Sequence, residues 1–274
     1  MSKNKFYTAI YDAAFKGVFC KRNNRDLLKA LLENSLKKKI EIQSLEANEI
    51  PKTNLYIRNK TLDAVVKVEK ELILIEVNSS VYNGLNRRNA AFIFSKYAEE
   101  TKVNENYKNM RNIIQINYTA GLPKDYPMVG VYKVVDIDTK KEYIDNITIY
   151  EFNVDKIVDA CYNGSDKTYA FVALLNTDKD KLSSVCKGDK MMEKFEKEIK
   201  DLNSDSGFVW FMTAEEDAKK VHNTLLSNSY EDGEKKGIKE RNVEIARNLL
   251  SRKMTVKEIS EITGLSKKEI ESLN

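Results

Sequence analysis

Two short runs of β-branched and other apolar residues, with a charged patch between them, form the clearest hydrophobic pattern in this chain. The runs are residues 62–68 and 72–78, and the patch at 69–71 is Glu-Lys-Glu. This arrangement is typical of a β-hairpin. Loops of two or four residues give the same register, in which Asp63 lies opposite Glu76.

Side chains alternate between the two faces of a strand, so the hairpin has one apolar face and one face that carries polar groups. The apolar face is predicted to lie against a core, and its members are Leu62, Ala64, Val66, Val68, Ile73, Ile75 and Val77. The other face carries Asp63, Lys67, Glu76 and Asn78 among Val65, Leu72 and Leu74. Directly opposed side chains have Cβ atoms about 5 Å apart.

Two carboxylates at that separation repel each other unless a proton or a cation intervenes. From the spacing alone, Asp63 and Glu76 are most simply interpreted as the solvated end of an ordinary hairpin. The oxygen-only side chains around them favour an alternative, because carboxylates and amides suit Mg²⁺, which takes one or two acids from a protein and keeps several waters. A magnesium site is therefore a hypothesis that the pattern supports.

The remainder of the first half alternates between helical and strand patterns. Apolar residues at helical spacing predict helices at 11–19 and 27–36, ahead of the hairpin, and at 86–101 after it. Three further runs, bounded by Pro, Gly, Asp or Asn, predict strands at 112–118, 128–137 and 144–154. Strands on either side of a crossover helix predict an α/β core.

Strand patterns disappear from residue 156 onward. Helices are predicted at 160–175, 190–202 and 214–226. A charged stretch with two glycines at 229–241 disfavours a continuous helix and is predicted to be a connector. The pattern thus predicts three segments: a core at 1–155, a helical extension at 156–228, and a connector with a helix-turn-helix-like tail at 229–274.

The tail carries two explicit helix starts. Thr255 with Glu258, and Ser266 with Glu269, are capping-box patterns, and Gly264 lies between the two helices that they open. A pair of short helices joined by a tight turn can enter a DNA groove. Without a clear basic face, a helical module for protein contacts is an equal alternative.

Composition excludes several kinds of protein. The chain of 274 residues has 46 Lys and Arg against 42 Asp and Glu, a net charge of +4 that permits nucleic acid without arguing for it. No apolar run approaches membrane-spanning length, so we expect a cytoplasmic protein with no membrane partner. Cys20, Cys161 and Cys186 are too widely spaced for a zinc cluster or a disulfide framework. His222 is the single histidine, which disfavours metal sites built from several histidines and Ser-His-Asp catalysis.

Several motifs, taken in order, resemble one known family. They are Y-D-A-A-F-K-G-V-F at 11–19, K-T-L-D at 60–63, I-E-V-N at 75–78, and Arg88 four residues before Phe92. The likeness continues at 106–108, 114–117, 143–149 and 245–265. In this order and spacing the chain resembles the PD-(D/E)XK nuclease family transposases, also called recombination-promoting nucleases, over nearly its whole length.

The resemblance implies a restriction-endonuclease-like core, in which helices flank a mixed sheet, and DNA cleavage with Mg²⁺, or with Mn²⁺ as an alternative ion. It implies that Asp63 and Glu76 are metal ligands and that the backbone carbonyl of Val77 adds a contact. Asn78 is a departure, because the general fold pattern has lysine there and this family often has glutamine. An amide can orient a water but supplies neither positive charge nor a base near neutral pH.

Three functions compete at this point. The first is a Mg²⁺-dependent DNA endonuclease with catalytic residues Asp63, Glu76 and Asn78. Its phosphate contacts would be Lys16, Lys60 and Arg88, although each cation by itself is more simply a solvated surface charge. The second is a DNA-binding or partner-binding protein that retains the fold without the chemistry.

The third function is self-association, which would make the protein a homodimer. Its contact would come from the aromatic residues Phe208, Trp210 and Phe211 in the helical half. Burial in the core is the better interpretation of these three residues. DNA is therefore the partner that we expect first.

Overall fold

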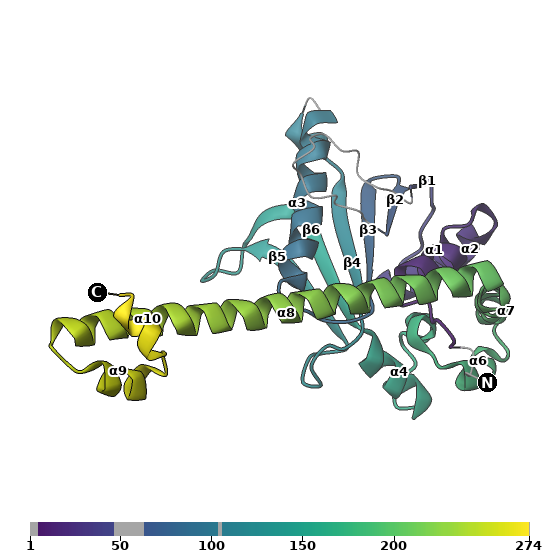
Figure 1. The fold of residues 1–274 in the computed structure, drawn as a ribbon. Coiled ribbons are helices and arrows are strands. Elements are labelled where there is room, and N and C mark those ends of the chain that lie inside the picture. The colour runs from purple at the N-terminus through teal and green to yellow at the C-terminus, as the bar shows by residue number, and fades with distance from the viewer. Residues whose placement is uncertain (1–4, 47–62, 104–105, 274) are drawn as a thin grey trace. The chain divides into compact units, whose positions relative to one another are not determined.

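The computed structural model describes the backbone of residues 5–46, 63–103 and 106–273, and their side chains except at 102–103, 217–232 and 235–236. In this part of the chain six strands form one sheet, in the order β1-β2-β3-β4-β6-β5 (Figure 1). The strands are β1 (Ser44–Glu46), β2 (Ala64–Val68), β3 (Glu71–Asn78), β4 (Asn112–Thr119), β5 (Val129–Val135) and β6 (Glu142–Asn153). The pairs β3/β4 and β4/β6 are parallel, and the other neighbours are antiparallel. This mixed sheet, with helices beside it, confirms the predicted α/β fold.

β2 and β3 form the predicted hairpin. A two-residue turn joins them and Val68 pairs with Glu71, which is the predicted register. Continuing this register past the last pair of the ladder sets Asp63 opposite Glu76. The charged turn is exposed while the β-branched strands are largely buried, so burial of one apolar face fixes the register.

The apolar face of the hairpin lies in the larger core of the molecule. Its buried members there are Ala64, Val66, Ile73, Ile75 and Val77. The helices that contribute to this core are α1 (Asp12–Phe19), α2 (Arg25–Leu36), α4 (Val154–Tyr162), α5 (Ala170–Ala173), α6 (Lys179–Cys186) and α7 (Lys190–Ser204). Short 3₁₀ turns occur at η1 (Arg22–Asn24), η2 (Tyr107–Asn109) and η3 (Leu174–Asn176).

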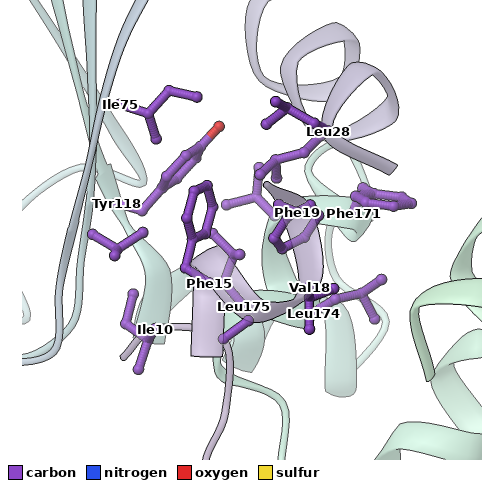
Figure 2. Packing of buried hydrophobic residues seen from close by; sticks show 14 of the residues in the cluster. Ile10, Phe15, Val18, Phe19, Leu28, Ile75, Tyr118, Phe171, Leu174 and Leu175 are labelled. Carbon is purple, nitrogen blue, oxygen red and sulfur yellow. The ribbon is translucent and has the colours of Figure 1, made fainter. Parts of the chain in front are cut away.

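Aromatic rings of α1 form the centre of this core. Figure 2 shows Phe15 and Phe19 between the sheet residues Ile75 and Tyr118 and side chains of the surrounding helices. The rings of Phe15 and Phe19 lie 4.9 Å apart between centroids. The hydroxyl of Tyr118 is 2.6 Å from the hydroxyl of Ser35, so the buried oxygen has a partner.

The opposite face of the sheet packs against α3 (Leu85–Val103) (Figure 1). The apolar contact is a smaller cluster of Val65, Leu72, Leu74, Phe92, Ile93, Ile113 and Ile147. On the same face, towards the carboxyl ends of β3, β4 and β6, apolar residues give way to polar ones. The helix therefore covers one part of this face with apolar contacts and borders a polar part.

The predicted helix at 160–175 is wrong. α4 begins directly after β6, where the side chain of Asn153 accepts a hydrogen bond from the backbone N–H of Lys156 at 3.2 Å. It ends at Tyr162, and Gly164 takes a positive φ of 71° in the turn before α5. The Asn-Gly-Ser-Asp sequence at 163–166 is a turn signal that the apolar spacing on either side conceals. β1 and α6 were not predicted from the sequence.

The predicted connector at 229–241 is helical, because α8 runs without a break over Ser206–Ser251. The chain forms two compact units, Met1–Val209 and Trp210–Asn274, so the predicted boundaries at 155 and 228 fall inside these units. Good helix formers such as Glu and Lys surround the glycines and offset their low propensity. Although α8 has 46 residues, no helix in the described chain is long and apolar enough to cross a membrane.

The predicted packing of Phe208, Trp210 and Phe211 against the core is confirmed for Phe208 only. Phe208 packs against Tyr7 with ring centroids 6.1 Å apart. Trp210 is 73% exposed and Phe211 is 50% exposed, so the prediction for these two residues is wrong. Their positions fall where the first unit ends and α8 continues, which helical spacing alone does not reveal.

The second unit contains the predicted pair of short helices. α9 (Val256–Thr263) and α10 (Lys267–Glu271) both begin with complete capping boxes, and Gly264 ends α9 with a φ of 71°. A small core joins them to the end of α8 through Ala246, Ile259, Leu265 and Ile270. The local signals for this pair are confirmed.

Candidate functional site

A group of buried polar side chains lies on the α3 side of the sheet, at the carboxyl ends of the parallel strands. Strand pairing sets Glu76 beside Asn117, Asn78 beside Thr119, and Asn117 beside Glu151. Each of these five residues is at most 6% exposed. Buried polar groups are costly unless they are paired, and this end of an open α/β sheet is where such folds place their ligand sites.

Asp63 and Glu76 form the acidic part of this group. Asp63 directly precedes β2, and its Oδ2 accepts a hydrogen bond from the backbone N–H of Val77 at 2.7 Å. Glu76 accepts a hydrogen bond on Oε2 from the Arg88 guanidinium, whereas its Oε1 is buried and has no hydrogen-bond partner among the described residues. One carboxylate oxygen of the pair is therefore left for a further ligand.

Burial is the main influence on both acids. It raises the pKa of Asp63 well above its usual value, helped by a hydrogen bond with Asp12 and by the charge of Glu76, and opposed by the N–H of Val77. Burial also raises the pKa of Glu76, to about 8, and the neighbouring Arg88 opposes this shift. In the absence of a cation, the two carboxyl groups resist being charged together.

Lys16 of α1 lies beside the acids. Its Nζ is 2.8 Å from Asp12 and 3.6 Å from Asp63, and 34% of the side chain is exposed. The predicted phosphate contact is thus next to the acidic pair and still reaches the surface. Lys60, the second predicted contact, lies outside the described residues.

Arg88 of α3, the third predicted phosphate contact, is part of the buried group. Its Nη2 donates to Glu76 at 2.9 Å and to the Oδ1 of Asn78 at 2.7 Å. The guanidinium lies near two aromatic rings, 5.8 Å from the centroid of Tyr82 and 5.5 Å from that of Phe92. The side chain is nevertheless 40% exposed, so Arg88 contacts Glu76 and also reaches the surface.

Asn78 uses both ends of its amide within the protein. Oδ1 accepts from Arg88, and Nδ2 donates to the hydroxyl of Thr119 at 3.1 Å. That hydroxyl donates in turn to Glu151, whose other oxygen accepts from the amide of Asn117 at 2.9 Å. A continuous chain of hydrogen bonds therefore links Glu151 on β6, through Thr119, Asn78 and Arg88, to Glu76 on β3.

Four residues at this site were not predicted from the sequence: Asp12, Asn117, Thr119 and Glu151. Asp12 lies in the first turn of α1, and its spacing of four from Lys16 is the spacing of a helical ion pair. In β4 the signal was the run of polar residues at every second position, Gln115, Asn117 and Thr119, inside an otherwise apolar strand. When alternate residues give a buried strand one polar face, that face is a candidate functional site.

The residues present fit a hard divalent cation. The donors are oxygens, and the Oε1 of Glu76 has no hydrogen-bond partner among the described residues. Because the N–H and C=O of one residue point to the same side of a strand, the carbonyl of Val77 also points towards Asp63. Among the described residues no group of three or more His, Cys, Asp or Glu is placed to share a metal. The two carboxylates and the Val77 carbonyl, completed by water, are an oxygen ligand set that Mg²⁺ accepts.

Comparison with known proteins agrees with these motifs. The model of the PD-(D/E)XK nuclease family transposases matches residues 9–228. That span includes α1, the hairpin, α3 and all of the buried polar group, whereas the motif at 245–265 lies outside it. No curated protein and no solved structure matches the chain. Since the match covers most of the sequence and the sheet has the arrangement that the motifs predict, the chain belongs to the PD-(D/E)XK nuclease family transposases.

Proposed function

We propose that this protein is a Mg²⁺-dependent DNA endonuclease that hydrolyses phosphodiester bonds, with Mn²⁺ as a substitute ion, in DNA recombination or the movement of a mobile element. The observation that carries the proposal is the unpartnered, buried Oε1 of Glu76 opposite Asp63. Two acids that repel each other in a dry site favour a cation between them. Family membership supports the reaction class.

Asp63, Glu76 and the carbonyl of Val77 would hold the ion. When bound, such an ion lowers the pKa of a water and stabilises the charge of the phosphate. The side chains of Lys16 and Arg88 are both partly exposed beside the acids, and in our proposal they contact DNA phosphates. Glu76 is buried, which keeps bulk water from its carboxylate and strengthens its attraction to a cation.

Plasmid nicking by the purified protein tests the proposal. We expect cleavage with Mg²⁺ or Mn²⁺ and none with Ca²⁺ or EDTA. Asp63→Asn and Glu76→Gln should each lower the rate by roughly a hundredfold or more, without unfolding the protein, because each removes an acid whose charge is costly to bury beside the other. Asp145→Asn, an exposed acid on β6, is the matched control and should cleave like wild type. Cleavage in EDTA, or full activity of both acid variants, would refute the proposal.

A second candidate function is DNA binding without cleavage. The observation that favours it is that both ends of the Asn78 amide are already bonded inside the protein, which leaves this group little freedom to orient a water. A gel-shift assay beside the nicking assay distinguishes the two functions. Wild-type protein that binds DNA but nicks it with none of the ions would support the second candidate and exclude the first.

A further inference from the structure

The guanidinium of Arg88 has two different sides. Nη2 makes both short hydrogen bonds, to Glu76 and Asn78, and Nε has a longer one of 3.4 Å to the side chain of Asn89. None of the hydrogen bonds between described residues involves Nη1. Since 40% of the side chain is exposed, the two N–H groups of Nη1 are available to a phosphate oxygen, for which arginine is well suited.

The orientation of Arg88 depends on Asn78, whose amide could in principle face either way. Its Oδ1 must face the guanidinium, because an arginine only donates hydrogen bonds. That orientation turns Nδ2 towards Thr119, which then has to accept. The hydroxyl of Thr119 can accept from Asn78 while its own proton goes to Glu151.

Glu151 sets the direction of this chain of hydrogen bonds. One carboxylate oxygen accepts from Thr119 and the other accepts from Asn117 at 2.9 Å. Gln115 supports this orientation of Asn117, because its side-chain amide donates to the Oδ1 of Asn117 at 2.9 Å. A reversal of Asn117 alone would set its Oδ1 against a Glu151 oxygen and its amide N–H groups against that donor. Because Thr119 and Asn117 both donate to it, Glu151 accepts at both oxygens. Thr119 therefore accepts from Asn78, and Asn78 accepts from Arg88.

We propose that Glu151 and Thr119 are positioning residues of the nuclease site: through Asn78 they hold Arg88 with one nitrogen on Glu76 and the other directed at the DNA phosphate. This inference rests on the proposed function and assigns roles to two residues whose hydrogen bonds reach the acidic pair only through Asn78 and Arg88. Asn78 is a positioning residue as well, and it orients the arginine.

Thr119→Val tests the proposal, because valine keeps the shape of threonine but can neither donate nor accept. We expect the single-turnover rate with Mg²⁺, and DNA affinity measured in Ca²⁺, each to fall roughly ten- to a hundredfold, as expected when a hydrogen bond to a charged group is lost. Thr119→Ser keeps the hydroxyl and should restore both. Thr177→Val is the matched control, since Thr177 is also buried and its hydroxyl also makes a hydrogen bond of 2.8 Å, to the carbonyl of Ala173.

Two further variants make the test specific. Glu151→Gln should behave like Thr119→Val, because a carboxamide can accept from only one of the two donors, Thr119 and Asn117; this variant also serves if Thr119→Val does not fold. Arg88→Ala should lose activity and affinity by roughly a hundredfold or more. Added guanidinium ion should recover part of the lost activity, which a purely structural role would not permit.

The outcomes separate the two proposals. Equal rates and equal DNA affinities for wild type, Thr119→Val and Thr177→Val would overturn the positioning role while leaving the nuclease proposal intact. If wild type does not cleave, the nuclease proposal fails, and DNA affinity in Ca²⁺ alone decides the positioning role. In that case a normal affinity of Thr119→Val and Glu151→Gln, beside a weakened Arg88→Ala, would overturn it.

Discussion

The hydrogen bonds of Glu76 do not fully compensate for the burial of its carboxyl group. The residue is 2% exposed and lies opposite Asp63 in the hairpin register, and only one of its carboxylate oxygens has a partner among the described residues. Arg88 offsets part of the cost of burying a charge, but the pKa still rises to about 8 because burial dominates. At neutral pH the metal-free protein therefore holds a proton at Glu76 that a divalent cation would displace.

Stability of the metal-free protein should fall as pH rises. The unfolded chain ionises Glu76 near 4.5, whereas the folded chain keeps the proton until about pH 8. The contribution is complete below the lower value and is lost between the two, by on the order of a few kcal/mol. Melting temperatures from pH 5 to 9 in EDTA should show this decline. Glu76→Gln should reduce the slope, and Mg²⁺ should reduce it in wild type.

The control for this prediction is Glu261→Gln, which removes an exposed charge from α9. It should keep the wild-type slope, because the expected effect comes from burial of the carboxyl group and not from net charge. A wild-type melting temperature as insensitive to pH as that of Glu76→Gln would contradict the assigned burial of the proton.

At the scale of elements, the positions of Asp63, Glu76 and Asn78 were predictable, and those of Asn117, Thr119 and Glu151 were not. Asp63 and Glu76 lie on one hairpin, where alternation and a charged turn determine the register from local sequence. Thr119 and Glu151 reach the site through parallel pairing of strands that are distant along the chain. A parallel register is set by tertiary packing, so the sequence indicates polar positions in β4 without saying which residues they meet.

α8 shows a second limit of local patterns. The glycines at 233 and 237 favoured a connector, yet both lie within a continuous helix. Glycine costs about 1 kcal/mol relative to alanine in a helix interior, which is small beside the summed propensity of a long run of good helix formers. Propensity thus marks a weak point in α8 but does not end the helix.

Replacing these glycines should strengthen α8. A Cβ built at Gly233 or Gly237 meets nothing within 4 Å, so Gly233→Ala and Gly237→Ala should gain the full propensity difference. Hydrogen exchange of backbone amides around residues 229–241 should slow about fivefold for each change. Exchange that becomes faster would show that this part of α8 is not helical in solution.

Gly17→Ala is the informative contrast, because it lies in α1 against α7. A Cβ there would be 2.8 Å from the Cδ2 of Leu202, which is too close without movement of that side chain. We expect crowding to offset the helix propensity, so the melting temperature should stay level or fall. A clear rise would mean that Leu202 moves aside at no cost.

At the scale of the whole molecule, the first unit depends on helices that the sequence assigned to a separate extension. Phe171, Leu174, Leu175 and Phe195 are each at most 4% exposed and belong to the same core as the sheet. The N-terminal segment is also tied to α7, since Tyr7 donates to the side chain of Asn203 at 2.7 Å and accepts from it at 3.0 Å. The sheet and these helices therefore stabilise one another.

Two truncated chains should consequently behave in opposite ways. A chain that ends at residue 228 keeps the whole first unit, which ends at Val209, and should melt cooperatively. A chain that ends at 155 loses the four buried side chains named above, each contributing about 1.5–3 kcal/mol through burial, against a total stability of roughly 5–15 kcal/mol for a domain. It should show no cooperative transition in calorimetry and should bind a dye for exposed apolar surface. A cooperative melt of the 155-residue chain would instead establish the sheet, α1, α2 and α3 as an independent domain, with α4 to α7 as an addition to it.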